Sequence, residues 1–117
     1  MTMTAGSMLS CTVEGAVATL LINHPPANTL TPELLAELST TFDQVAKDEA
    51  VKVVVLTGTG RFFIAGADIR VLASIASSKE GEAMALQGQA ILDRIEGVGK
   101  PVIAAINGIC LGGGLEL

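Results

Sequence analysis

Apolar and polar residues alternate along the first part of the chain in a pattern typical of β-strands. Met8–Glu14 and Ala16–Ile22 alternate on either side of the step from Glu14 to Gly15, which predicts a β-hairpin. The segment "NHPPAN" (Asn23–Asn28) then ends the second strand, because its two prolines cannot donate sheet hydrogen bonds. We therefore expect a hairpin followed by a turn.

The spacing of apolar residues then changes from strand to helix. Thr31 is a suitable N-cap, Pro32 fits the first helical position, and the helix dipole favours Glu33 in the first turn. These signals predict a helix that ends near Asp48. Its apolar residues fall on one stripe at helical spacing: Leu34, Leu35, Leu38, Phe42, Val45 and Ala46.

A second group of elements begins with β-branched residues. The run Val51–Thr57 predicts a strand that is buried on both faces. Gly58–Arg61 ("GTGR") predicts a turn, and Phe62–Ala65 predicts a short strand. Asp68–Leu72 has the length of a single helical turn.

The final third of the chain predicts a long helix, a strand and the start of another helix. Ser77 and Glu80 match a capping box, and the helix that they open ends at "GVGKP". Pro101–Asn107 predicts another buried strand, and Gly112–Leu117 is typical of a helix N-terminus. The apolar face of the long helix carries Met84, Ile91, Leu92 and Ile95.

The order of these elements repeats as two strands and then a helix. Units of about 45–50 residues favour a wound α/β architecture over a bundle or a sandwich. The third unit is interrupted after its loop. Residues 1–8 are mostly small and polar and predict a flexible leader, and residues 9–117 are expected to belong to one domain.

Composition and charge exclude several classes of protein. Half of the residues are apolar and 16% are charged, which excludes a disordered chain. The chain has no Trp or Tyr and a net charge of −5, so a nucleic-acid-binding surface is disfavoured. The longest apolar runs are far shorter than a membrane span.

The N-terminal region and the cysteines indicate a cytoplasmic protein. The first 24 residues contain no Lys or Arg, so a secretory signal would lack its basic segment. Cys11 and Cys110 match no metal-binding or redox spacing, and two distant cysteines are typical of reduced thiols.

Two segments place small residues beside a carboxylate, which makes them candidates for chemistry. They are "FFIAGAD" (Phe62–Asp68) and "GICLGGGLE" (Gly108–Glu116), and each follows a predicted strand and precedes a predicted helix. Free backbone N–H groups at such places can bind an anion or a developing oxyanion. The alternative is that both are tight turns where a helix packs closely on a sheet.

Other motifs in the sequence give weaker evidence for a functional site. Neither loop ends in the Gly-Lys-Ser/Thr of a phosphate loop, and the glycine spacing does not match a dinucleotide fingerprint. His24, the single histidine, lies in a proline turn and is expected to be solvated or to act as a cap. One histidine and two scattered cysteines are too few for a metal site. Asp68 is either an N-cap or a ligand contact.

Glu116 differs from the other carboxylates because Leu115 and Leu117 flank it. This setting predicts a side chain that points into an interior. A buried carboxylate holds its proton more tightly than an exposed one, so it can act as a general base or acid near neutral pH.

Taken together, these segments resemble the crotonase (enoyl-CoA hydratase/isomerase) family. The resemblance covers nearly the whole chain from about Leu9 and rests on three blocks in the family order. They are "HPPANTLTPELL", "VKVVVLTGTGRFFIAGADI" and "KPVIAAINGICLGGGLEL". The resemblance implies the family's spiral of ββα units, the ClpP/crotonase superfold, with residues 9–117 as the N-terminal part of a crotonase domain.

The resemblance also implies a set of site residues. The thioester oxygen of an acyl-CoA would lie between the backbone amides of Ala67 and Gly113, which would stabilise an enolate-like charge. Ala27, Asn28, Ala65, Gly66 and Asp68 match positions that line the coenzyme A moiety, mostly through backbone. Glu116 matches the first of two glutamates typical of hydratases, the one that activates water. The acyl-CoA is the substrate, and no separate cofactor or metal is implied.

The chain departs from the family in length. Family members are about twice as long or longer, and their remaining part supplies the second glutamate and the contacts of a trimer or hexamer. We therefore expect this chain to be incomplete and to be weakly active or inactive alone. Three alternatives stay open: a non-catalytic acyl-CoA-binding module, an enoyl-CoA isomerase, and the hydratase part of a multifunctional β-oxidation enzyme.

Overall fold

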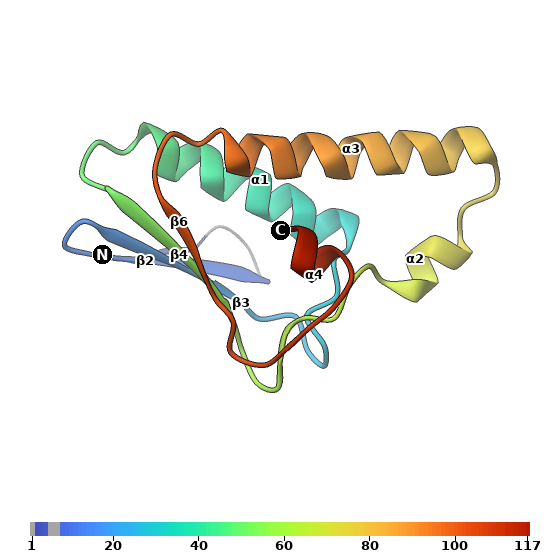
Figure 1. Cartoon of the computed structure of the whole chain (residues 1–117), viewed down its shortest axis with the longest axis horizontal. Helices are drawn as coiled ribbons and strands as arrows, with labels where there is room; N and C mark the ends of the chain where they lie inside the picture. Colours follow the sequence, from blue (N-terminus) through green and yellow to red (C-terminus); the bar gives the residue numbers. More distant parts are fainter. Residues whose placement is uncertain (1, 5–7) are drawn as a thin grey trace.

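The predicted repeat of two strands and a helix is present in the folded chain (Figure 1). The computed structural model describes residues 2–4 and 8–117. The strands are β1 (Thr2–Thr4), β2 (Leu9–Glu14), β3 (Val17–Ile22), β4 (Val53–Gly58), β5 (Phe62–Ile64), β6 (Val102–Ala105) and β7 (Ile109–Cys110). The helices are α1 (Pro32–Lys47), α2 (Ile69–Ala73), α3 (Ser78–Glu96) and α4 (Gly113–Glu116). The chain therefore makes the units β2-β3-α1, β4-β5-α2-α3 and β6-β7-α4.

The strands form two sheets whose topology brings separate loops together. The larger sheet has the order β1-β2-β3-β4-β6, and β5 and β7 form a small second sheet. β2 and β3 are the predicted antiparallel hairpin, whereas β3–β4, β4–β6 and β5–β7 are parallel. Parallel neighbours need crossover connections, which α1 and then α2–α3 supply. The segments that follow β4 and β6 therefore lie at the same end of the structure.

Both long helices begin at the predicted caps. The Thr31 hydroxyl accepts a hydrogen bond from the backbone N–H of Leu34 at 3.2 Å, and α1 ends at Lys47 with Asp48 as its C-cap. The Ser77 hydroxyl accepts from the N–H of Glu80 at 3.1 Å. The Glu80 carboxylate accepts from the N–H of Ala76 at 3.3 Å, one residue before the cap. Side-chain oxygens thus satisfy N–H groups that a helix leaves free at its start.

The core lies between α1 and the larger sheet. α1 buries most of the predicted stripe, but Leu35 is half-buried and Ala46 is exposed. Alternate residues of β2, β3 and β4 point toward α1. The fully buried members of this cluster include Leu9, Leu20, Ile22, Leu34, Leu38, Phe42, Val45 and Val54. Burying each of these side chains contributes about 1.5–3 kcal/mol, so this face of the sheet carries most of the stability.

The C-terminal segment is tied to α1 through one lysine. The Nζ of Lys100 donates to the backbone carbonyls of Val45 and Asp48, the latter at 2.7 Å. These carbonyls belong to the end of α1, where a cation also interacts favourably with the helix dipole. β6 therefore begins at a place that α1 defines.

Strand β6 is more exposed than predicted. Pro101–Asn107 was expected to be buried, but Ile103 is 53% and Ile106 57% exposed. β6 is the edge strand beside β4, and no layer covers its outer side in the part of the chain that the structure describes. Val51–Thr57 was expected to be buried on both faces. In β4, however, Val54 and Leu56 are buried and their neighbours are only half-buried.

Two strands were not predicted. β7 has two residues, too few for an apolar pattern, and pairs with β5. At the other end, residues 1–8 were expected to be a flexible leader. Residues 1 and 5–7 lie outside the described residues, but Thr2–Thr4 form β1 and pair with β2, with Thr2 opposite Thr12. Backbone pairing along the edge of β2 makes this strand, and no side-chain pattern signals it.

The core analysis gives a first prediction. Leu38→Ala should lower the free energy of unfolding by about 2–5 kcal/mol, because Leu38 is fully buried and its loss leaves a cavity. The matched change Leu86→Ala, at a residue of α3 that is 57% exposed, should change it by less than about 0.5 kcal/mol. Urea unfolding followed by circular dichroism measures both values. Equal losses in the two variants would contradict the placement of the core.

Candidate functional site

The two loops that the sequence singled out are in contact. One runs from β5 to α2 (Ala65–Asp68) and the other from β7 to α4 (Leu111–Gly113). Gly66 and Gly112 both have positive φ angles, of 116° and 53°. A β-carbon added to Gly112 would lie 3.5 Å from the Cα of Gly66. The backbones therefore approach to van der Waals distance, and glycine tolerates both the φ angles and the approach.

Directly after this contact, each loop carries a backbone amide that has no acceptor among the described residues. The amides are those of Ala67 and Gly113. Leu30 pairs with Ala67 as a parallel bridge, in which the N–H of Leu30 donates to Gly66 and that of Asp68 donates to Leu30. This pairing does not use the N–H of Ala67. Ala67 is exposed and Gly113 half-buried, so neither residue is enclosed by the fold.

Other glycines of the C-terminal loop serve close packing. A β-carbon at Gly114 would lie 2.7 Å from the carbonyl oxygen of Ile64, and one at Gly108 would lie 2.2 Å from that of Arg61. Neither distance is tolerable without movement of the backbone. The tight-turn interpretation therefore holds for Gly108 and Gly114, while Gly66 and Gly112 bring the donor loops together.

The segments expected to line coenzyme A lie side by side. The N–H of Ala65 donates to the carbonyl of Ala27 at 3.2 Å, and that of Leu30 donates to Gly66 at 2.8 Å. Ala27 is half-buried, whereas Asn28 is buried. The two stretches thus form one backbone strip that leads to Ala67.

An aliphatic cavity opens beside Ala67. It has a volume of about 360 Å³ and lies among α1, α2 and α3. Ala67, Asp68 and Glu116 form part of its wall, and Gly81 and Gly88 of α3 leave room in it. Its other lining residues include Leu30, Leu35, Val71, Ile75, Met84 and Ile91. Such a space can take an apolar group next to a backbone donor and a carboxylate.

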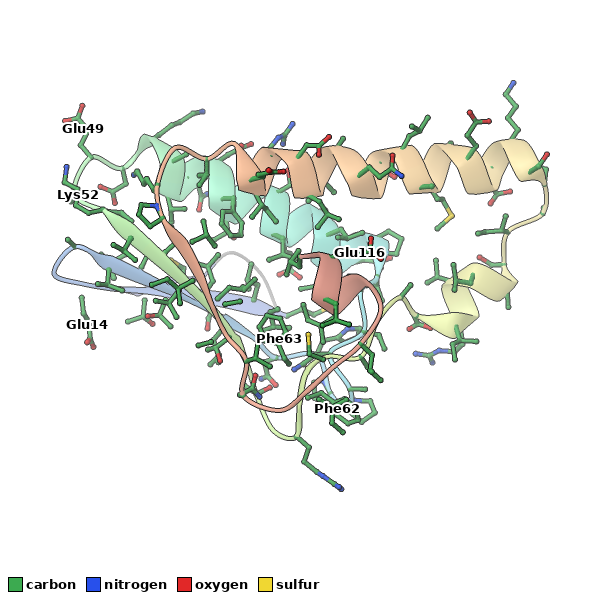
Figure 2. All side chains as sticks on the ribbon, in the orientation of Figure 1. Glu14, Glu49, Lys52, Phe62, Phe63 and Glu116 are labelled. Atoms are coloured by element: carbon green, nitrogen blue, oxygen red, sulfur yellow. The ribbon has the colours of Figure 1, made fainter. Side chains whose placement is uncertain are left out.

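Glu116 reaches this cavity but is not buried. It lies on α4, the short helix in the middle of the view in Figure 2. The sequence predicted that its side chain points into an interior, and this is wrong for the described structure, where Glu116 is exposed. Leu115 is also exposed, and among these three residues only Leu117 packs against the core. The single turn of α4 leaves one of its sides open.

Asp68 is an N-cap. Its carboxylate accepts from the backbone N–H of Arg70 at 2.8 Å and pairs with the guanidinium of Arg70 at 3.2 Å. The Asp68 side chain is 8% exposed and that of Arg70 89%. The hydrogen bonds from Arg70 hold the pKa of Asp68 below its usual value. Of the two interpretations left open, the N-cap is confirmed, and its carboxylate is already paired.

His24 and Cys11, two further candidate residues, make contacts that belong to the fold. The Nδ1 of His24 lies 3.2 Å from the carbonyl oxygen of Thr29, inside its own turn. Cys11 is buried in the core, and burial, followed by the charge of Asp48, raises the pKa of its thiol. Within residues 2–4 and 8–117, no three His, Cys, Asp or Glu side chains gather as metal ligands. No described helix combines the length and hydropathy that a membrane span needs.

Two residues of the site were not predicted. Leu30 orients the backbone at Ala67 through its bridge. Asn107 bonds to the β4–β5 turn through both its side-chain oxygen and its side-chain nitrogen. A bridge between distant residues has no sequence signal. Asn107 precedes Gly108, and that dipeptide by itself predicts only a turn.

Known proteins that resemble this chain include enoyl-CoA hydratases. A model of the family "Enoyl-CoA hydratase/isomerase" matches residues 12–117. A probable enoyl-CoA hydratase of Bacillus subtilis is 46% identical over 109 residues, which cover 93% of this chain and 42% of that protein. A crystal structure of an enoyl-CoA hydratase from Bacillus anthracis superposes with a TM-score of 0.88 at 34% identity, over 94% of this chain and 43% of that one.

A longer relative matches over a smaller share of its length. The fatty acid oxidation complex subunit alpha of Idiomarina loihiensis is 43% identical over 103 residues, or 87% of this chain and 14% of that subunit. The chain thus spans less than half the length of each of these relatives.

The ion pair between Asp68 and Arg70 predicts how the stability of the fold changes at low pH. A carboxyl group whose pKa is lowered by folding stabilises the folded state at pH values above its ordinary pKa of about 3.9. This stabilisation is lost as the pH falls through the lower, folded value. Asp68→Asn keeps a capping side chain but lacks the charge. The difference in unfolding free energy between the two proteins should be constant above about pH 5 and shrink below about pH 4. A difference that does not change with pH in urea unfolding would contradict the pairing.

Proposed function

Because the chain belongs to the enoyl-CoA hydratase/isomerase family, we propose that it binds an acyl-CoA and carries the water-activating half of a 2-enoyl-CoA hydratase site. The product is the 3-hydroxyacyl-CoA. One observation carries this proposal: the loops touch at Gly66 and Gly112, so the unused amides of Ala67 and Gly113 adjoin one another.

The two amides act on the thioester. When water adds to the double bond, electrons move from the Cα–Cβ bond toward the thioester oxygen, which becomes enolate-like. Two N–H donors aimed at that oxygen stabilise the charge, and one such donor is worth about 2.7–4 kcal/mol in known sites. The absence of side chains at Gly66 and Gly112 lets the thioester reach the donors.

Glu116 acts on water. Its carboxylate accepts a proton from a water molecule while the oxygen of that water bonds to Cβ. The product also needs a proton at Cα, which a second acid must supply, as the second glutamate does in hydratases of the family. The exposure of Glu116 fits a group that exchanges protons with solvent.

The cavity among α1, α2 and α3 receives the acyl chain. Its wall is mostly aliphatic, and Ala67 and Glu116 lie on the same wall, so an apolar tail there leaves the thioester close to one donor and to the carboxylate. The Ala27–Asn28 and Ala65–Gly66 strip offers backbone groups to the coenzyme A moiety.

A second candidate is an acyl-CoA-binding module without turnover. The ion pair of Asp68 favours it, because that carboxylate is engaged with Arg70. Among the described residues that line the cavity, this leaves Glu116 as the one unpaired carboxylate. Hydration needs a proton acceptor and also a proton source for Cα, whereas binding needs neither.

The donor role of Gly113 gives a direct test. Gly113 is the first residue of α4, where proline is tolerated. Gly113→Pro removes the N–H, and Gly113→Ala adds a β-carbon but keeps it. Butyryl-CoA, which has no double bond to hydrate, should bind at least about tenfold more weakly to the proline variant than to the alanine variant. Isothermal titration measures both constants, and equal affinities would rule out Gly113 as a donor.

The role proposed for the Glu116 carboxylate gives a prediction about turnover. The chain should bind butyryl-CoA yet hydrate crotonyl-CoA far more slowly than an intact enoyl-CoA hydratase, as followed by absorbance of the conjugated double bond. In a longer protein that contains these residues and hydrates enoyl-CoA, Glu116→Gln should lower kcat by about 10²–10⁴ with little change in binding. Rapid turnover by the chain, or loss of binding in the variant, would contradict the assigned role.

A further inference from the structure

All three asparagines of the chain gather at one turn. They are Asn23, Asn28 and Asn107, and the turn is the β4–β5 connection, residues 58–62. It lies at the end of the molecule away from α3, where Figure 2 labels Phe62. The chemistry proposed above uses none of these side chains.

Asn28 crosslinks its own turn to the β4–β5 turn. Its side-chain Nδ2 donates to the carbonyls of Thr59 at 3.3 Å and Phe62 at 3.0 Å. Its Oδ1 accepts from the backbone N–H of His24 at 2.8 Å. Asn28 is 1% exposed and has a φ of 52°, a conformation that asparagine tolerates better than most residues. Its side-chain nitrogen and oxygen both have partners, which a buried amide requires.

Asn107 bonds to the same turn from another segment of the chain. It follows β6, and its Nδ2 donates to the carbonyls of Gly60 and Phe62, each at 3.1 Å. Its Oδ1 accepts from the N–H of Gly58 at 3.0 Å. The amide groups of Asn28 and Asn107 therefore share one acceptor, the carbonyl oxygen of Phe62.

That oxygen lies near the start of the two strands that lead to the donor loops. Phe62 is the first residue of β5, which leads to Ala67, and it pairs with Ile109 of β7, which leads to Gly113. Asn28 also lies two residues before Leu30, whose bridge orients Ala67. Two side chains thus fix three separate backbone segments at one point.

We propose that Asn28 and Asn107, named here the asparagine clamp, are positioning residues that set the spacing between the amides of Ala67 and Gly113. The inference rests on the function proposed for those amides. Donors to an oxyanion must be held within about 0.5 Å of the productive geometry. The clamp holds the starts of the two strands that lead to the donor loops, and so restrains the position of both donors.

The test uses the whole chain and two ligands. Butyryl-CoA has the thioester oxygen, and S-butyl-CoA, a thioether, has the same chain without it. The wild type should bind the thioester more tightly, and this preference reports on the two donors. Asn28→Asp and Asn107→Asp keep the shape, the acceptor oxygen and the tolerance of positive φ, but lose the NH₂ donors. Each should lower the preference by about tenfold. Asn107→Asp, which lies outside the proposed coenzyme A strip, should also leave thioether affinity near the wild-type value.

Asn23→Asp is the matched control. The Oδ1 of Asn23 only accepts, from the Thr59 hydroxyl at 3.2 Å, so aspartate keeps its role while adding the same charge at the same turn. This variant should retain the preference. If it loses the preference equally, charge rather than a lost donor is responsible, and the clamp is wrong.

The remaining outcomes separate the clamp from the proposed function. If the wild type binds butyryl-CoA and S-butyl-CoA equally well, the oxyanion site is refuted, and the clamp is refuted as well. A normal preference in both clamp variants refutes the clamp alone. Equal weakening of both ligands would indicate general destabilisation and would also refute it. If circular dichroism shows that Asn28→Asp does not fold, Asn107→Asp decides the question, because Asn107 is exposed and its replacement is better tolerated.

Discussion

The site depends on a close approach of two backbones. The β5–α2 and β7–α4 loops touch at Gly66 and Gly112, where no side chain separates them. Gly108 and Gly114 extend the same constraint, because a β-carbon at either would collide with a carbonyl oxygen of the β5 segment. Gly66 and Gly112 thus let the two loops meet, while Gly108 and Gly114 let the C-terminal segment pack closely against the backbone around β5. Their entropic cost on folding is offset by a core on the other side of the molecule.

That core lies mainly in the first unit and in β4. α1 covers β2, β3 and β4, and Lys100 joins the end of α1 to the start of β6. The stable part therefore fixes where β5 and β7 begin, while the site is assembled from loops beyond it. α2 and much of α3 extend away from the sheet in Figure 1 and bury little apolar surface. They shape the cavity more than they stabilise the fold.

The two carboxylates near the donors have different environments. Asp68 is held by Arg70 and caps α2, so its charge serves the helix. Glu116 is unpaired and exposed on a single helical turn. Two acidic residues that each follow a small-residue loop thus differ in environment: Asp68 is paired within the fold, and Glu116 is exposed.

The sequence alone determined the elements whose signals are local. The hairpin, the caps Thr31 and Ser77, most of the apolar stripe of α1 and the ββα order follow from residues close together in the chain, and the structure confirms them. The loop motifs also pointed to the family. Only the tertiary structure decided what depends on distant neighbours: the exposure of β6 and Glu116, the pairing of β7, the Leu30 bridge, and the meeting of the Asn28 and Asn107 side chains at Phe62. Burial and hydrogen-bond partners depend on which segments pack together, and parallel crossovers bring together residues that no local pattern relates.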